Sequence, residues 1–181
     1  MDLGLKGLNA IVTGGTRGIG RAIAETLADE GANVAICARH ADDVESAVAA
    51  LQAKGVRSTG RAVDVGDGPA LQEWVRDVAG EFGGIDIVVS NVSALAIGGD
   101  EDSWNSGFQI DMMGAVRLVD AAMPSLESSK APAIVTISSA ETLETTMSIP
   151  PNSAATSRTH SCNAGPSPTS RARPVARTPF A

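Results

Sequence analysis

The sequence predicts an α/β fold in which a doubly wound parallel sheet carries helices on both faces. Five short apolar runs alternate with four longer segments whose apolar residues recur every three or four positions, as on one face of a helix. Parallel strands need crossover connections, and these are right-handed, so the alternation fits a doubly wound sheet. A hydrophobic content of 43%, with 19 glycines in 181 residues, agrees with one α/β domain.

Three strands and two helices are expected in the first part of the chain. The apolar run "NAIVTGG" at 9–15 predicts a buried strand that enters a glycine turn. An amphipathic helix over 17–32 follows, and "NVAICAR" at 33–39 predicts the second strand. Acidic residues begin the next helical segment, 42–55, and a glycine ends it, before a shorter third strand at 60–65.

Two more helices and two more strands are expected before the pattern stops. The segment 68–83 repeats the helical spacing, and "IDIVVSN" at 85–91 predicts the fourth strand. A long helix is expected over 102–126, and the fifth strand over 131–140. Two glycines weaken the prediction of that long helix. They are Gly107 and Gly114.

The chain changes character near residue 150. All 21 acidic residues lie at or before Glu144, whereas 151–181 contains four arginines, several prolines and no acid. We therefore expect an ordered domain over 1–150 and an irregular or disordered basic tail over 151–181. The acidic body argues against nucleic acid as a partner, and spaced arginines are most often simply solvated.

Neither cysteines nor apolar stretches indicate a secreted or membrane protein. Two cysteines are too few for a disulfide framework. Cys37 lies in an apolar run and is expected to be a small buried hydrophobic residue. No apolar stretch approaches the roughly 18–20 residues of a membrane span, and the N-terminus lacks the pattern of a signal peptide. A cytoplasmic protein is expected, with no membrane partner and no metal site.

The glycine-rich loop "VTGGTRGIG" at 12–20 predicts a nucleotide site. It joins the first strand to the first helix, whose N-terminus presents free N–H groups and a positive dipole end to a phosphate. Gly14 allows a sharp turn, Gly18 allows close approach of a pyrophosphate, and Gly20 allows helix and strand to pack closely. The alternative is a purely structural turn, but the surrounding strand–helix–strand pattern favours a Rossmann-type sheet that binds a dinucleotide.

Two arginines favour NADP(H) over NAD(H). An acid at the end of the second strand would bind a ribose 2′-hydroxyl, but the chain has Ala38 and Arg39 there, with Arg17 in the glycine loop. A guanidinium pairs well with a phosphate. A solvent-facing Arg39 would leave the preference open. Asp64, at the end of the third strand, is expected to accept from the adenine amino group with Val65 against the ring; the alternative is that Asp64 caps the next helix.

The spacing Gly14-x-x-x-Gly18-x-Gly20, with "DV" at 64–65 and "ISSA" at 137–140, resembles the short-chain dehydrogenase/reductases, most closely the 3-oxoacyl-carrier-protein reductases. The resemblance covers residue 5 to about residue 140. It implies hydride transfer between NAD(P)(H) and a small carbonyl or alcohol substrate. Together with the loop and the arginines, it implies a cofactor site made of Thr13, Gly14, Thr16, Arg17, Gly18, Ile19, Gly20, Arg39, Asp64, Val65 and Asn91. The segment "SNVSA" at 90–94 replaces the usual "NNAG".

The catalytic residues that the resemblance implies are only partly present. Ser139 matches the Ser that holds the substrate oxygen, and Asp111 stands where relatives usually carry Asn. Asn152 and Thr156 occupy the positions of the acid/base Tyr and of the Lys four residues later. A phenol with a pKa of about 10 can be tuned towards neutrality, whereas an amide has no proton to exchange there.

Three hypotheses remain open at this stage. The chain is a reductase whose C-terminal part is altered or missing after the fifth strand, a natural NADP(H)-binding or interaction protein without catalysis, or an enzyme with unorthodox residues. The first predicts impaired hydride transfer. The resemblance further implies that copies could pair through the helix 102–126 and the helix after it. Because that next helix is not recognisable in the sequence, pairing would be weakened, and the alternative is that an exposed apolar face causes aggregation.

Overall fold

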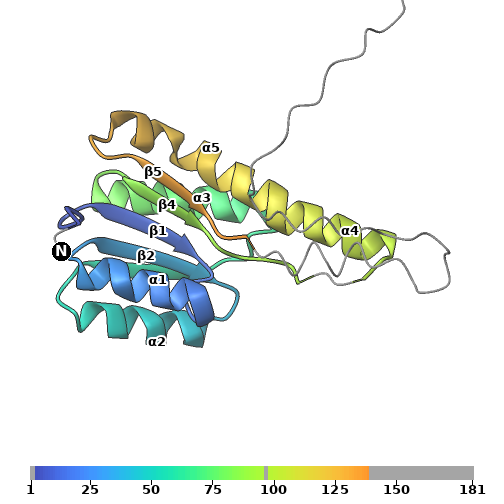
Figure 1. Ribbon diagram of the computed structural model, residues 1–181, viewed down its shortest axis with the longest axis horizontal. Helices are drawn as coiled ribbons and strands as arrows, with labels where there is room; N and C mark the ends of the chain where they lie inside the picture. Colours follow the sequence, from blue (N-terminus) through green and yellow to red (C-terminus); the bar gives the residue numbers. More distant parts are fainter. Residues whose placement is uncertain (1–2, 96–97, 139–181) are drawn as a thin grey trace, which may run out of the picture. The chain divides into compact units, whose positions relative to one another are not determined.

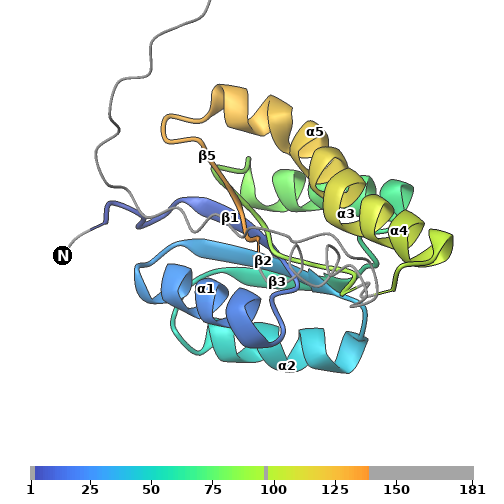
Figure 2. The ribbon, with the colours of Figure 1, turned by 45° about the vertical axis from the view of Figure 1, so that its right-hand side comes forward.

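In the computed structural model the described residues are 3–95 and 98–138, all within one compact unit, Met1–Ser148. The expectations for Ser139, Asn152, Thr156 and the basic tail lie outside the described residues, as does the expected boundary at residue 150. The strands of the described part form one parallel sheet in the order β3-β2-β1-β4-β5 (Figures 1 and 2). They are β1 (Asn9–Thr13), β2 (Asn33–Ala38), β3 (Ser58–Ala62), β4 (Ile87–Ser90) and β5 (Ala133–Thr136).

Helices cover both faces of this sheet, as the sequence predicts for a doubly wound fold. Figures 1 and 2 show α1 and α2 on one face and α3 and α5 on the other, with α4 beyond the ends of the strands in line with α5. The helices are α1 (Gly18–Asp29), α2 (Ala41–Gln52), α3 (Gly68–Phe82), α4 (Glu101–Gly107) and α5 (Met113–Ser128), with a π-helical segment η1 (Phe108–Met112) between the last two.

Neighbouring side chains of the buried strands point to opposite faces of the sheet, so each face has its own hydrophobic core. In β1, Ala10 and Val12 pack with α1 and α2, whereas Ile11 between them packs on the α3 and α5 side. This follows from the two-residue period of a strand, since neighbouring side chains point to opposite faces. Because both faces are covered, β1 and β2 read in the sequence as continuous apolar runs.

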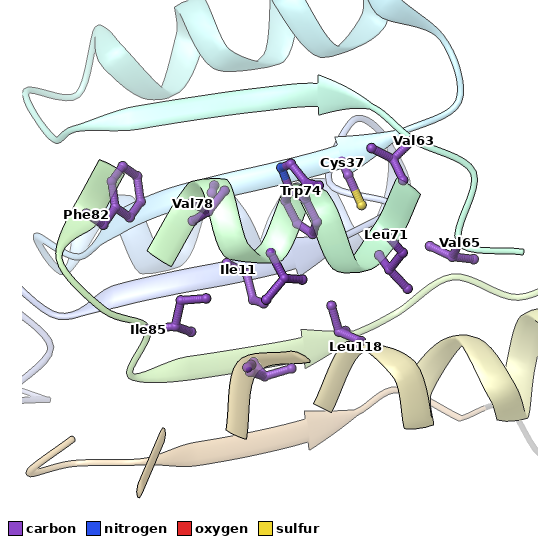
Figure 3. Packing of buried hydrophobic residues seen from close by; sticks show 14 of the residues in the cluster. Ile11, Cys37, Val63, Val65, Leu71, Trp74, Val78, Phe82, Ile85 and Leu118 are labelled. Carbon is purple, nitrogen blue, oxygen red and sulfur yellow. The ribbon is translucent and has the colours of Figure 1, made fainter. Parts of the chain in front are cut away.

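The core on the α3 side is the one that contains the large aromatic residues. Leu71, Trp74, Val78 and Phe82 recur at helical spacing along α3 and point to the sheet, where Cys37 and Ile11 meet them (Figure 3). Leu118 of α5, fully buried, closes the same cluster. At the start of α3 the side chain of Asp67 accepts a hydrogen bond from the N–H of Ala70 at 3.1 Å, and Gly83 ends the helix with a φ of 83°.

Three elements differ in form or extent from the sequence prediction. The fifth strand, expected over 131–140, spans only Ala133–Thr136 among the described residues. The long helix expected over 102–126 spans Glu101–Ser128, but its α-helical hydrogen bonding is interrupted by η1, between Gly107 and Gly114. The third strand runs over Ser58–Ala62 rather than 60–65, because polar Ser58 and Thr59 pair with β2 and the chain turns away at Asp64.

β5 is the most exposed strand of the sheet. It pairs with β4 through Ala133–Thr136, yet the side chains of all four residues are exposed. Among the described residues, no helix is both long enough and apolar enough to cross a bilayer.

Candidate functional site

The sheet has its switch point between β1 and β4. From β1 the chain proceeds outward through β2 and β3, and then returns to place β4 and β5 on the other side of β1. Ligands of open α/β sheets bind where the strand order reverses, at the carboxyl ends of the strands. The loops that meet there are the glycine loop after β1 and the segment 91–95 after β4.

The glycine loop is packed so closely that side chains are excluded on its inner side. A Cβ atom on Gly20 would overlap the carbonyl oxygen of Gly14 and the Nδ2 atom of Asn91, and one on Gly15 would lie 2.5 Å from Ile36 Cγ2. Gly14 itself has a φ of 67°, and its N–H donates to the carbonyl of Cys37 at 2.8 Å. The inner glycines therefore fix the loop against β2 and β4.

The outer side of the same loop is open. Gly18 has a φ of 55°, and a Cβ there would meet no atom within 4 Å. Arg17 is the N-cap residue of α1 but makes no side-chain capping bond, and the first turn of α1 contains no acid. By contrast, the first turn of α2 carries Asp42 and Asp43. The N-terminus of α1 therefore has no carboxylate of its own, which suits an external anion.

Asn91 joins the glycine loop to the end of β4. Its N–H donates to Thr13 Oγ1 at 2.9 Å, and its side-chain amide donates to the Thr13 carbonyl at 3.1 Å. The Thr13 hydroxyl, which is buried, donates in turn to the Val89 carbonyl at 3.4 Å. Thr13 thus links β1 to β4 by hydrogen bonds, and no local pattern in the sequence predicts this double contact.

Arg17 and Arg39 are both exposed at this end of the sheet, as are Ile19 and the neighbouring His40. Thr16 is half-buried. Neither arginine takes part in the ion pairs of the described residues, which join Arg21 to Glu25, Lys54 to Asp29 and Arg61 to Asp77. Both guanidinium groups are therefore available to an anion at the carboxyl ends of β1 and β2.

Asp64 and Val65 differ in exposure. Asp64 is exposed and accepts a hydrogen bond from Gly66 N–H at 2.9 Å, whereas the Val65 side chain is buried in the core. The residue that caps α3 is Asp67, so the alternative of Asp64 as the helix cap does not apply. A ligand at this edge would meet the Asp64 carboxylate before the Val65 side chain.

Asp111 lies in η1 and contacts the segment after β4. Its Oδ1 atom accepts from the N–H of Ala94 at 2.6 Å, and its Oδ2 atom accepts from Ser93 Oγ at 3.2 Å. Ser93 Oγ also accepts from the N–H of Leu95 at 3.2 Å. Leu95 has a φ of 50°, a left-handed conformation that costs a non-glycine residue on the order of 1–3 kcal/mol.

Cys37 lies beneath this site and takes no part in it. Burial raises the pKa of its thiol to about 12, and a backbone hydrogen bond from Gly14 opposes that rise in part. The thiol is therefore protonated at neutral pH and acts as a small core residue, as the sequence predicts.

Two hollows occur away from these loops. One of about 360 Å³ is bordered by Asn9, Asp86 and Ser129, and one of about 640 Å³ lies between α2 and β3. In the first, Asp86 accepts from Asn9 N–H and from the Ser129 hydroxyl at 2.8 and 2.5 Å, so its carboxylate is already occupied by the protein. Neither hollow brings together the residues that the sequence singles out.

Known proteins match most of the chain. The family model "short chain dehydrogenase" matches residues 8–158. An isoepoxydon dehydrogenase of Penicillium expansum is 40% identical over 144 residues, which cover 77% of this chain and 55% of that protein. A 3-oxoacyl-[acyl-carrier-protein] reductase of Staphylococcus epidermidis is 32% identical over 136 residues, with 72% and 56% covered. The chain thus spans about half the length of the curated relatives it matches.

Solved structures agree on the fold and differ in their cofactor. A short-chain dehydrogenase from Burkholderia cenocepacia in complex with NADP has a TM-score of 0.71 at 34% identity, over 75% of this chain and 57% of that one. An NAD⁺-bound xylitol dehydrogenase has a TM-score of 0.68 at 27% identity, over 73% and 53%. The Rossmann-type sheet, its glycine loop and the extent of these matches all lead to the same conclusion: the chain belongs to the short-chain dehydrogenase family.

Proposed function

We propose that this chain binds NADP(H) at the glycine loop, as the cofactor-binding half of a short-chain reductase. The observation that carries the proposal is the contrast within that loop. Its inner glycines leave no room for a side chain, whereas Gly18 opens to free space beside an α1 N-terminus that lacks both a side-chain cap and acids. A pyrophosphate fits such a cradle, because it needs close backbone approach and free N–H donors.

Most of the remaining site residues have a role in this proposal. Thr16, Ile19 and the backbone of Gly18 border the pyrophosphate, Arg17 and Arg39 bind the 2′-phosphate, and Asp64 accepts from the adenine amino group. Asn91 positions the nicotinamide ribose through its fixed place beside Thr13. Ser139 holds the oxygen of a small carbonyl or alcohol substrate. When bound, the nicotinamide supplies or accepts the hydride.

We further propose that hydride transfer is impaired in this chain. Asn152 and Thr156 stand where the family pattern has its acid/base Tyr and its Lys, and neither can exchange a proton near neutral pH. The second candidate function, an NADP(H)-binding protein without catalysis, rests on the same two residues.

Calorimetric titration with NADPH and NADH, followed by a turnover assay, tests the function. We expect saturable NADPH binding with weaker NADH binding. Arg39→Ala is expected to weaken NADPH binding about 10-fold or more and to leave NADH binding unchanged, since a charge-assisted phosphate contact is lost. Arg76→Ala, an exposed arginine of α3, is the matched control. A flat NADPH titration would remove the proposal.

The turnover arm separates the two candidate functions from an active enzyme. NADPH oxidation is followed with a panel of β-keto esters and other carbonyl compounds. We expect no rate above the enzyme-free blank. A carbonyl-dependent rate that depends on Ser139 would show that the chain is active with unorthodox residues, and impairment would then be wrong.

We also propose that two copies of the chain pair through the helical segment from α4 to α5. Five large apolar side chains along it are 36–60% exposed, and the first four recur every four residues, on one helical face. They are Trp104, Phe108, Met112, Val116 and Met123.

A further inference from the structure

The segment after β4 is held at both of its ends by side chains from other elements. At its start, Asn91 is bonded twice to Thr13 of β1. Two residues on, the carboxylate of Asp111 accepts from the Ala94 N–H and from the Ser93 hydroxyl. Between these points, Val92 lies so close to the glycine loop that a Cβ on Gly14 would come within 3.1 Å of Val92 Cγ2. A change in the hydrogen bonds of Ser93 and Ala94 to Asp111 would therefore be transmitted to the glycine loop through Val92 and Asn91.

The π-helical turn η1 carries Asp111, which accepts the hydrogen bonds from Ser93 and Ala94. In η1 the Met113 N–H donates to the carbonyl of Phe108, five residues back, so one extra residue is accommodated before α5 begins. Asp111 sits in that turn. Segments of this kind change the direction in which a side chain leaves the helix, and they recur at functional sites.

All of these hydrogen bonds point from donors in the segment 93–95 towards the Asp111 carboxylate as the final acceptor. Leu95 N–H donates to Ser93 Oγ, and the Ser93 hydroxyl donates to Asp111 Oδ2, while Ala94 N–H donates to Oδ1. An ionised carboxylate only accepts, so it can terminate both branches, whereas an amide would turn a donor towards Ser93. The Leu95 conformation, with its φ of 50°, is the strained feature that these bonds maintain.

We propose that Asp111 and Ser93 are a pair of positioning residues that fix the segment 91–95 against the glycine loop and thereby set the affinity for the cofactor. Asp111 acts as a fixed acceptor and transfers no proton. This inference rests on the proposed NADP(H) site, but the hold itself exists in the protein without a ligand. The two claims can therefore be tested separately on the full chain.

The first arm measures amide hydrogen exchange at Ala94 and Leu95 by NMR, without cofactor. Asp111→Leu is expected to speed exchange of both amides by about 10-fold or more, because it removes a charged acceptor. Ser93→Ala should speed exchange at Leu95 and leave Ala94 slow. Asp111→Asn keeps one carbonyl oxygen, so it should retain slow exchange at Ala94. The matched controls, Asp120→Leu and Ser106→Ala, change exposed residues of α5 and α4 and should leave both amides as they are.

The second arm measures NADPH affinity of the same variants. Asp111→Leu is expected to weaken binding about 10-fold, Ser93→Ala less, and the double variant no more than Asp111→Leu alone, since both act through one segment. Unchanged exchange at Ala94 in Asp111→Leu would overturn the hold. Faster exchange with unchanged affinity would overturn its role in binding. If the unmodified chain binds no NADPH, the proposed function fails, while the exchange arm still decides whether the pair fixes the segment.

Discussion

At the scale of single residues, close packing and a few side-chain hydrogen bonds position the loops at the carboxyl ends of β1 and β4. Gly14 and Gly20 are recognisable because the turn and the close packing admit no side chain, and their spacing expresses that requirement directly. The double contact of Asn91 with Thr13 and the contact of Ser93 with Asp111 join residues 78 and 18 positions apart. Such contacts depend on how β1, β4 and η1 are placed in space, so no local pattern announces them.

Gly20→Ala tests the close packing of the loop. Its Cβ would overlap Gly14 O and Asn91 Nδ2, so we expect the free energy of unfolding to fall by about 1–3 kcal/mol, with weaker NADPH binding. The matched control is Gly80→Ala in α3, where a Cβ meets nothing within 4 Å. That variant should gain up to about 1 kcal/mol from helix propensity. Urea denaturation measures the stability of both variants. If Gly20→Ala were as stable as the unmodified chain, the loop would be able to make room for the added Cβ.

At the scale of elements, the apolar period predicts the existence of each helix and strand better than its limits. The long helix over 102–126 is present, but the π-turn of η1 lies within it, and only the flanking Gly107 and Gly114 gave a sign of irregularity. β3 begins at Ser58 because it pairs with β2 there, and pairing does not require apolar side chains on an edge strand. Tertiary contacts, rather than local preference, set these limits.

Leu118→Ala tests the packing of α5 onto α3. Leu118 is fully buried in the cluster around Trp74, so its truncation is expected to lower the free energy of unfolding by about 2–5 kcal/mol. Glu127→Ala, at an exposed position of the same helix outside the proposed pairing stripe, should change it by no more than about 0.5 kcal/mol. Similar losses in the two variants, measured by urea denaturation, would mean that α5 does not pack on α3 as described.

At the scale of the whole molecule, the described part is a five-stranded sheet with helices on both faces and an exposed apolar stripe along the segment from α4 to α5. If copies pair through the stripe from Trp104 to Met123, light scattering after gel filtration should give twice the chain mass at micromolar concentration. The Met112→Ser variant, with Trp104→Ser, should then shift the mass to that of a monomer, because it removes two of the exposed apolar side chains. A monomer at all concentrations in the unmodified chain would contradict the pairing.

The glycine loop, Arg39 and Asn91 follow β1, β2 and β4, so the sheet brings them together at the carboxyl ends of its strands. This arrangement underlies the proposed cofactor site. A crystal structure of the full chain grown with NADP⁺ tests it most directly. We expect the pyrophosphate within about 3 Å of backbone N–H groups at Gly18 and Ile19, with the Arg39 guanidinium on the 2′-phosphate. Electron density for the nucleotide elsewhere on the protein, or none at saturating NADP⁺, would contradict the account.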